Sequence, residues 1–184
     1  MSSVALVAKP HRWTRIEYER MVEAGVVHPE ARFELMDGEI IDMSPQGSYH
    51  ATSIQVIAEY IRQLFSTGYH VRIQMPLALG EDSEPEPDVA VVMGGFMDYR
   101  DAHPQTAVLV VEVANSTLAY DRLKANSYAS HAIPEYWLVN LKENCLEVFQ
   151  QPENGRYTSY RSLKAGSSFV CANGQQVEVG SLLV

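Results

Sequence analysis

The sequence predicts an α/β domain with a mixed central sheet flanked by helices. Two short runs, DVAVVM at 88–93 and AVLVVEV at 107–113, are rich in β-branched residues and almost continuously apolar. Such runs are typical of central strands that are covered on both faces. Apolar residues recur at helical intervals over 49–67, and a second helix is expected over 120–131. Helices interleaved with buried strands indicate layers of helix packed on a sheet.

The N-terminal third predicts a short helix, a hairpin and a long helix. Thr14 and Glu17 have the spacing of a capping box, so a helix should begin there and end near Ala24. The segment 32–43 carries two short apolar runs around an Asp-Gly pair, which indicates a β-hairpin. Gly68 is placed to cap the helix at 49–67.

The middle of the chain predicts a strand, an acidic loop and a helix. We expect a strand over 70–79, with Pro76 near an edge or a bulge. The following EDSEPEP, at 81–87, is interpreted as a solvated loop because its prolines exclude a strand or helix interior. The helix at 120–131 should end before Pro134, with Leu123 and Tyr128 facing inward.

The remaining sequence is rich in expected strands. The runs EYWLVN, CLEVFQ, YTSYRSL and SFVCA are separated by turn-type sequences. Tyr136 and Trp137 lie in the first run and are interpreted as sheet core rather than as base-stacking residues. We therefore expect one domain over 1–184, with a core at about 32–140, an N-terminal helix region at 1–31 and a β-rich C-terminal extension at 141–184.

The composition is that of a globular protein. It is 46% hydrophobic and 20% charged, and no apolar run reaches the roughly 18 residues of a membrane helix. These features favour a cytoplasmic protein without a membrane partner. Cys145 and Cys171 are far apart and have no histidines or cysteines at ligand spacing. They indicate buried strand residues rather than a disulfide framework or a zinc site.

The net charge of −9 counts against a domain that grips nucleic acid over its whole surface. A carboxylate-rich site is nevertheless acidic by construction, and bound divalent cations offset part of that charge. Five cations fall within the first 32 residues and form either a phosphate-facing patch or, as their spacing favours, a solvated helix face. They are Lys9, Arg12, Arg15, Arg20 and Arg32.

Glu112 is the anomaly of the apolar run VLVVEVA. A carboxylate in such a strand is costly to ionise unless it is paired, hydrogen-bonded or bound to a metal. Asp88 opens the other buried run, and two adjacent strands would bring both carboxylates to one cation. Hard oxygen ligands without cysteine or histidine suit Mg²⁺, with Mn²⁺ as a substitute.

Lys124 follows Glu112 by twelve residues, in the first turns of the expected helix. Its ammonium would lean back over the strand end and orient a water or offset charge on a phosphate oxygen. The spacing equally fits a purely structural interpretation. In that alternative Glu112 and Lys124 form a buried ion pair, and Asp88 caps the start of a strand.

An ordered set of motifs resembles a known family. The set comprises RFELMDGEI, a histidine at a helix start, EPEPDVAVV, VLVVEVANST, DRLK and IPEYWLV, and it spans about 32–139. The sequence resembles the Uma family of restriction endonucleases, within the PD-(D/E)xK nuclease superfamily. This resemblance implies a restriction-endonuclease-like fold, DNA as the substrate, Mg²⁺ as the cofactor and a homodimer.

The resemblance also implies roles for individual residues. Asp88 and Glu112 would ligate the metal and Lys124 would be the catalytic lysine, acting from the helix because Ala114 occupies the usual lysine position. Glu34 matches an early acidic position of the site, although a solvent-facing hairpin residue is the alternative.

Two further polar residues fall within the same motifs. His50 either faces the site or makes a local hydrogen bond at a helix start. Asp121 is expected to be a helix N-cap or an orienting partner rather than a ligand.

The carboxylate pattern, together with what the resemblance implies, therefore predicts a Mg²⁺-dependent endonuclease that hydrolyses DNA phosphodiester bonds. Two alternatives remain open at this point. One is a non-catalytic binding or assembly module that keeps the fold, which the acidic surface would suit. The other is hydrolysis of a different phosphorylated substrate.

Overall fold

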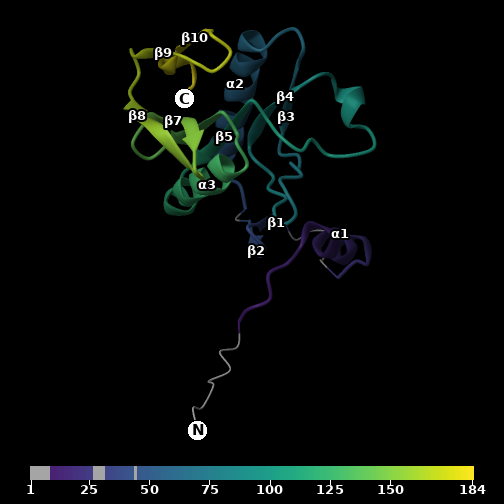
Figure 1. Ribbon diagram of the computed structural model, residues 1–184. Coiled ribbons are helices and arrows are strands. Elements are labelled where there is room, and N and C mark those ends of the chain that lie inside the picture. The colour runs from purple at the N-terminus through teal and green to yellow at the C-terminus, as the bar shows by residue number, and fades with distance from the viewer. Residues whose placement is uncertain (1–8, 27–31, 44) are drawn as a thin grey trace.

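A six-stranded mixed sheet forms the centre of the molecule (Figure 1). The computed structural model describes residues 9–26, 32–43 and 45–184. The strand order is β3-β4-β5-β6-β7-β8, and of its neighbouring pairs β5–β6 is parallel and the others are antiparallel. The strands are β3 (Tyr69–Ile73), β4 (Val89–Met93), β5 (Leu109–Ala114), β6 (Glu135–Asn140), β7 (Cys145–Glu153) and β8 (Arg156–Leu163). The predicted mixed α/β fold is confirmed.

Helix α3 (Leu118–Ser130) links the parallel strands β5 and β6. Parallel neighbours cannot be joined by a tight hairpin and need a crossover, here a helix. The chain leaves the carboxyl end of β5 and enters α3 after three residues. The end of β5 and the first turns of α3 therefore adjoin one another.

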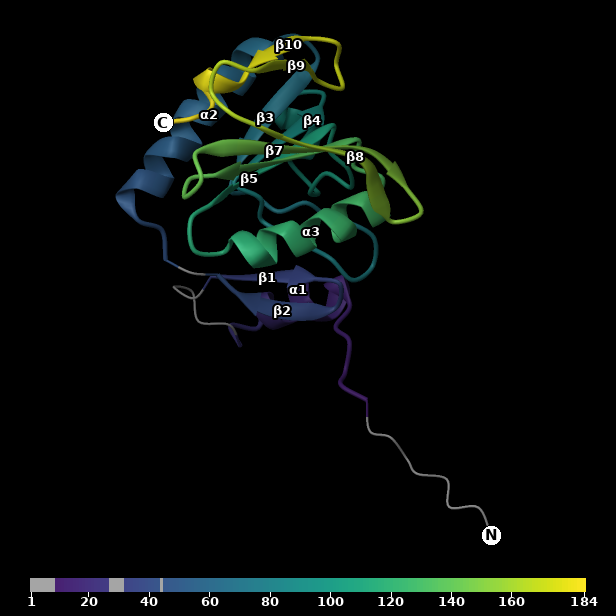
Figure 2. The same ribbon diagram turned by 90° about the vertical axis from the view of Figure 1, so that its left-hand side faces the viewer.

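The sheet separates two hydrophobic cores. Successive side chains of β5 point to opposite faces of the sheet, so this strand contributes residues to both cores. Leu109, Val111 and Val113 face the core that includes α2 (Ser48–Leu64). Val110 and Ala114 face the core that includes α3. The two helices cover opposite faces of the sheet (Figure 2). By the same alternation Glu112, between Val111 and Val113, faces α3.

Helix α1 (Arg15–Glu23) and the hairpin of β1 (Phe33–Met36) and β2 (Glu39–Asp42) precede the sheet. Thr14 and Glu17 form the predicted capping box at the start of α1. The predicted Asp-Gly turn is also present, with both residues at positive φ, as a tight hairpin turn requires. The hairpin lies beside α3 (Figure 2), where the Ser127 hydroxyl donates to Asp37 Oδ1 at 2.8 Å.

Several predicted boundaries were wrong. Helix α2 ends at Leu64 rather than near residue 67, with Phe65 as its C-cap, so Gly68 does not cap it directly. The strand predicted over 70–79 ends at Ile73, because Gln74 has a φ of 49° and leaves the extended conformation. Leu123, predicted to face inward, is 65% exposed, whereas Tyr128 is buried as predicted.

The last 44 residues contribute to two sheets. Strands β7 and β8 complete the central sheet, because β7 pairs with β6 along the full length of β6. Strands β9 (Ser168–Val170) and β10 (Gln176–Glu178) form a separate small sheet on the α2 side (Figure 2). Two short 3-10 helices are also present, η1 (Phe96–Tyr99) and η2 (Val179–Ser181).

Other details follow the sequence closely. Tyr136 and Trp137 are fully buried core residues, as predicted. Cys145 and Cys171 are both free and buried. In the part of the chain that the structure describes, no helix has the length and apolar character needed to cross a membrane.

Candidate active site

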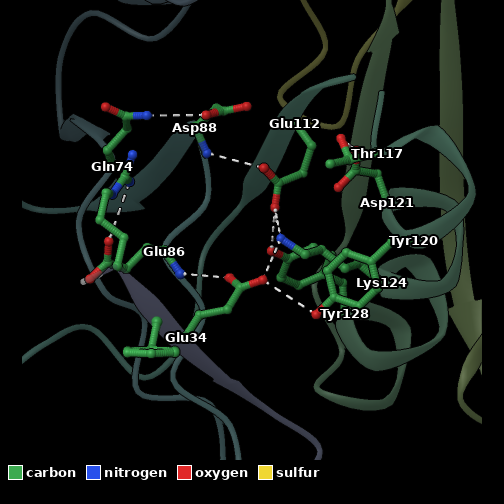
Figure 3. A network of polar contacts seen from close by, with 12 residues as sticks. Glu34, Gln74, Glu86, Asp88, Glu112, Thr117, Tyr120, Asp121, Lys124 and Tyr128 are labelled. Carbon is green, nitrogen blue, oxygen red and sulfur yellow. Dashed lines mark hydrogen bonds and ion pairs between the residues drawn. The ribbon is translucent and has the colours of Figure 1, made fainter. Parts of the chain in front are cut away.

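A pocket of about 150 Å³ opens where the β1–β2 hairpin, the start of α2, the end of β5 and the first turns of α3 meet. All four residues predicted for the site line it: Glu34, Asp88, Glu112 and Lys124. The structure thus brings together side chains from β1, β5, α3 and the residue before β4. Figure 3 shows these side chains converging.

Asp88 and Glu112 are held to each other's strands by backbone hydrogen bonds. The Asp88 N–H donates to Glu112 Oε2 at 3.2 Å (Figure 3), and the Val113 N–H donates to Asp88 Oδ2 at 2.9 Å. This exchange follows from the antiparallel pairing of β4 and β5, in which Val89 lies opposite Val111. Both carboxylates are almost completely buried, and each is oriented by the neighbouring strand.

Lys124 reaches back from α3 and lies between two carboxylates. Its Nζ is 2.8 Å from Glu34 Oε1 and 3.0 Å from Glu112 Oε1. The Tyr120 ring lies 5.3 Å from the same nitrogen and adds a cation–π contact. The lysine side chain is 5% exposed. A lysine on the helix therefore reaches the site even though Ala114 occupies the usual lysine position.

Glu34 faces the site rather than the solvent. It is 1% exposed, which excludes the alternative of a solvent-facing hairpin residue. Its Oε2 accepts the Glu86 N–H at 3.2 Å, and its Oε1 accepts the Tyr120 hydroxyl at 3.3 Å. These contacts fix Glu34 as a second partner of Lys124.

His50 and Asp121 also line the pocket. His50 Nε2 lies 3.4 Å from Asp88 Oδ1, and this hydrogen bond is the main reason that the pKa of His50 is raised. Asp121 accepts a hydrogen bond of 2.6 Å from the Thr117 hydroxyl. Thr117 is the N-cap of α3 and Asp121 lies inside the helix, so the N-cap interpretation of Asp121 was wrong.

The pocket is short of positive charge. Burial raises the pKa of Glu112 to about 8, although Lys124 opposes this, and the neighbouring Asp88 raises it further. Burial would lower the pKa of Lys124, but the carboxylates of Glu112 and Glu34 outweigh that effect and raise it well above its usual value. Lys124 is therefore protonated and positively charged. The carboxyl groups around it outnumber the nearby positive charges.

The residues present fit a magnesium ion in their chemistry. Asp88 and Glu112 offer hard carboxylate oxygens beside a pocket with excess negative charge. Among the described residues, no three or more histidine, cysteine, aspartate or glutamate side chains are grouped as a metal site. Magnesium commonly uses one or two carboxylates and completes its coordination with water and substrate oxygens. Two protein carboxylates are sufficient for such a site.

Three contributors were not predicted for the site. The Tyr128 hydroxyl donates to Glu112 Oε1 at 3.0 Å, and Tyr120 contacts both Glu34 and Lys124. Gln74 Nε2 donates to Asp88 Oδ1 at 3.3 Å. The helical period placed Tyr128 inward but gave no sign of its partner. No sequence signal pointed to Gln74.

The acidic loop at 81–87 is only partly solvated, contrary to the prediction. Glu84 is 7% exposed, and burial raises its pKa to about 7. The reason is that the loop folds against the hairpin, where the Glu84 N–H donates to the Leu35 carbonyl at 2.7 Å. Glu86 lies 3.6 Å from Arg32, which lines the pocket. Two of the four acids thus face the protein.

Several of the N-terminal cations have local acidic partners. Arg12 lies 3.2 Å from Glu39, and Arg15 lies 2.7 Å from Glu19. These contacts agree with the interpretation of a charge-balanced surface. Arg32 differs from them because it is the member of the group that lines the pocket.

Comparison with known proteins identifies related sequences and folds. A family model, Uma2, described as "Putative restriction endonuclease", matches residues 16–179. No curated protein matches the chain. Among solved structures, a putative nuclease belonging to DUF820 from Anabaena variabilis ATCC 29413 superposes with a TM-score of 0.72 at 12% identity, covering 92% of this chain and 97% of that one. This similarity supports the fold.

The type IIG restriction endonuclease BpuSI gives a TM-score of 0.41 at 19% identity. It covers 62% of this chain and 12% of the larger enzyme, a similarity too low to support an argument. The family match is independent of that comparison and extends over most of the sequence, from α1 to the end of β10. The chain belongs to the Uma2 family of restriction-endonuclease-related proteins.

Proposed function

We propose that this protein is a Mg²⁺-dependent endonuclease that hydrolyses DNA phosphodiester bonds. The observation that carries the proposal is the meeting of Asp88, Glu112 and Lys124 at one pocket. Two carboxylates that can hold a divalent cation, beside a fixed ammonium, are groups that metal-dependent phosphodiester hydrolysis uses. Membership of a family described as restriction endonucleases supports DNA as the substrate.

In this proposal Asp88 and Glu112 hold the magnesium ion. When bound, the ion supplies a Lewis acid for the scissile phosphate and lowers the pKa of a water. Lys124 places its ammonium toward the same pocket and offsets negative charge that develops on a phosphate oxygen. Glu34 and Tyr120 hold Lys124, and their contacts limit its rotation.

The pocket includes basic side chains in spite of its excess of carboxylates. Arg32 and His50 line it alongside the carboxylates. Arg32 is held by Glu86 with its guanidinium partly exposed, so it can contact a phosphate next to the scissile one. Such contacts need no basic face over the whole molecule, and a homodimer, which the proposal includes, would present two such pockets.

The test is cleavage of plasmid and branched DNA with and without Mg²⁺. Asp88→Ala and Lys124→Ala should each lower the cleavage rate by at least about 100-fold. Matched controls are Asp101→Ala and Lys142→Ala, because both side chains are exposed and neither lines the pocket. The controls should cut like the wild type. Equal cleavage by wild type and site variants would overturn the proposal.

A non-catalytic binding module is the second candidate. The ion pairs of Lys124 with Glu34 and Glu112, together with the net charge of −9, favour it. It predicts a wild type that cuts no DNA under any metal condition. Size-exclusion chromatography with light scattering on the same samples tests the homodimer.

A further inference from the structure

Gln74 has an unusual backbone conformation beside the candidate site. Its φ is 49°, in the left-handed region, which residues with a Cβ rarely adopt. Asparagine and aspartate adopt this region more readily because their short side chains hydrogen-bond locally, an advantage that glutamine lacks. Strain of this kind persists where the surrounding structure enforces it, and it clusters at functional sites.

The contacts of Gln74 converge on Asp88. Its backbone N–H is shared between the carbonyl oxygens of Pro87 and Asp88, at 3.2 Å each. Its side-chain Nε2 donates to Asp88 Oδ1 at 3.3 Å. One residue therefore holds both the main chain and the carboxylate of Asp88. The left-handed turn that ends β3 is what directs the carboxamide toward that carboxylate.

Gln74 approaches Asp88 from outside the pocket. Asp88 and His50 line the pocket, whereas Gln74 is not among the described residues that line it. Figure 3 shows Gln74 on the side of Asp88 away from Lys124. The other carboxylate oxygen accepts the Val113 N–H at 2.9 Å. A donor on each oxygen fixes the rotation of the carboxylate without filling the cavity.

We infer that Gln74 is a positioning residue that orients the Asp88 carboxylate toward a divalent cation in the pocket. The inference rests on the proposed function, in which Asp88 is a metal ligand. Gln74 suits this role because its amide is a neutral donor that cannot compete as an anion for the cation. Partners that orient metal ligands in this way typically contribute about 10- to 100-fold to metal affinity or activity.

Two substitutions of Gln74 separate the effect of its side-chain donor from the effect of its backbone conformation. Gln74→Gly removes the carboxamide and relieves the left-handed backbone. Gln74→Glu keeps the size and the backbone conformation but replaces the donor by an acceptor that repels Asp88. The matched control is Gln151→Gly, because Gln151 is also a glutamine with a φ of 62° but is exposed in β7.

The experiment measures Mn²⁺ binding by electron paramagnetic resonance, the Mg²⁺ dependence of DNA cleavage, and the melting temperature. We expect both Gln74 variants to bind Mn²⁺ about 10- to 100-fold more weakly and to need correspondingly more Mg²⁺ for cleavage. The Gln151→Gly control should bind and cut like the wild type. Both glycine variants should change the melting temperature similarly, since each relieves one left-handed residue and loosens the unfolded chain.

The outcomes distinguish this inference from the proposed function. Wild-type Mn²⁺ affinity in both Gln74 variants would overturn the inference and leave the nuclease proposal standing. A wild type that binds Mn²⁺ but cuts no DNA would overturn the nuclease proposal alone, while weaker binding by the variants would still support the positioning role. A wild type that binds no Mn²⁺ would overturn both. A lower melting temperature for Gln74→Gly with unchanged metal binding would show a purely structural role.

Discussion

Glu112 and Glu147 are both buried glutamates in the central sheet, and each is paired with a cation from α3. Glu147 is satisfied by many donors. Arg122 contacts both of its carboxylate oxygens, at 2.5 and 3.0 Å, and Asn140 and Tyr160 donate to it at 3.4 and 3.3 Å. Burial alone would raise the pKa of Glu147, but these donors outweigh burial and lower it.

Glu112 has a different balance of partners. It shares Lys124 with Glu34, and Asp88 and Asp121 add further negative charge nearby. Its pKa is raised to about 8, in the opposite direction to that of Glu147. The two sites thus start from similar strands and the same helix. The donors of Glu147 outweigh the effect of its burial, whereas Glu112 lies in an excess of negative charge beside a pocket, as expected of a functional site.

The largest expected contrast is in DNA cleavage. Glu112→Gln should lower the Mg²⁺-dependent cleavage rate by about 100-fold or more, because it removes a proposed metal ligand without changing the side-chain size. Glu147→Gln should leave the rate per folded molecule within about 2-fold, because its contacts lie outside the pocket. Initial rates at saturating Mg²⁺ check this. Equal losses in both variants would remove the functional distinction between the two glutamates.

The next contrast is in stability at pH 7.5. Glu147→Gln should lower the free energy of unfolding by about 2 kcal/mol, because it weakens several hydrogen bonds to a buried charge. Glu112→Gln should instead raise it, because at pH 7.5 the carboxyl ionises freely in the unfolded chain but not in its buried site, and glutamine avoids this cost. Urea denaturation without metal measures both. A loss of stability in Glu112→Gln would mean that its ion pair with Lys124 outweighs the cost of burying its charge.

The same pair shows what sequence could and could not reveal. Glu112 in VLVVEVA was recognised as anomalous, but Glu147 in CLEVFQ has similar apolar neighbours and is equally buried. Local pattern predicts burial of both and cannot tell which one is surrounded by excess negative charge. That difference depends on Arg122 and Lys124, two residues apart on α3, facing different strands.

The fold was predictable where periodicity is strong and local. The strands around Asp88 and Glu112 and the helix that carries Lys124 were of this kind. Glu34 and Gln74 belong to other segments, and their directions depend on the docking of a hairpin and on one left-handed residue. The addition of β7 and β8 to the central sheet likewise depends on long-range pairing. Such features arise from tertiary contacts that no local pattern encodes.

The smallest contrast, and the most specific, is in the pH dependence of stability without metal. The folded-state pKa of Glu112 is raised, so between about pH 4.5 and 8 the carboxyl keeps its proton when folded and loses it on unfolding. Its contribution to stability therefore falls as the pH rises through this range. The folded-state pKa of Glu147 is lowered, so its stabilisation is complete above about 4.5 and is lost as the pH falls below that value. Lys124, with a raised pKa, keeps its charge through both ranges.

The melting temperatures of Glu112→Gln and Glu147→Gln, each compared with that of the wild type, should therefore change over different pH ranges. Glu112→Gln should gain stability relative to the wild type between pH 4.5 and 8, because the variant lacks the group whose ionisation is unfavourable. Glu147→Gln should lose least at pH 3 and most above pH 5, because the wild type then has its ionised carboxylate fully paired with Arg122. Parallel curves for the two variants would show that both carboxyls titrate alike. The excess charge at Glu112 would then have to be neutralised by a group other than its own proton.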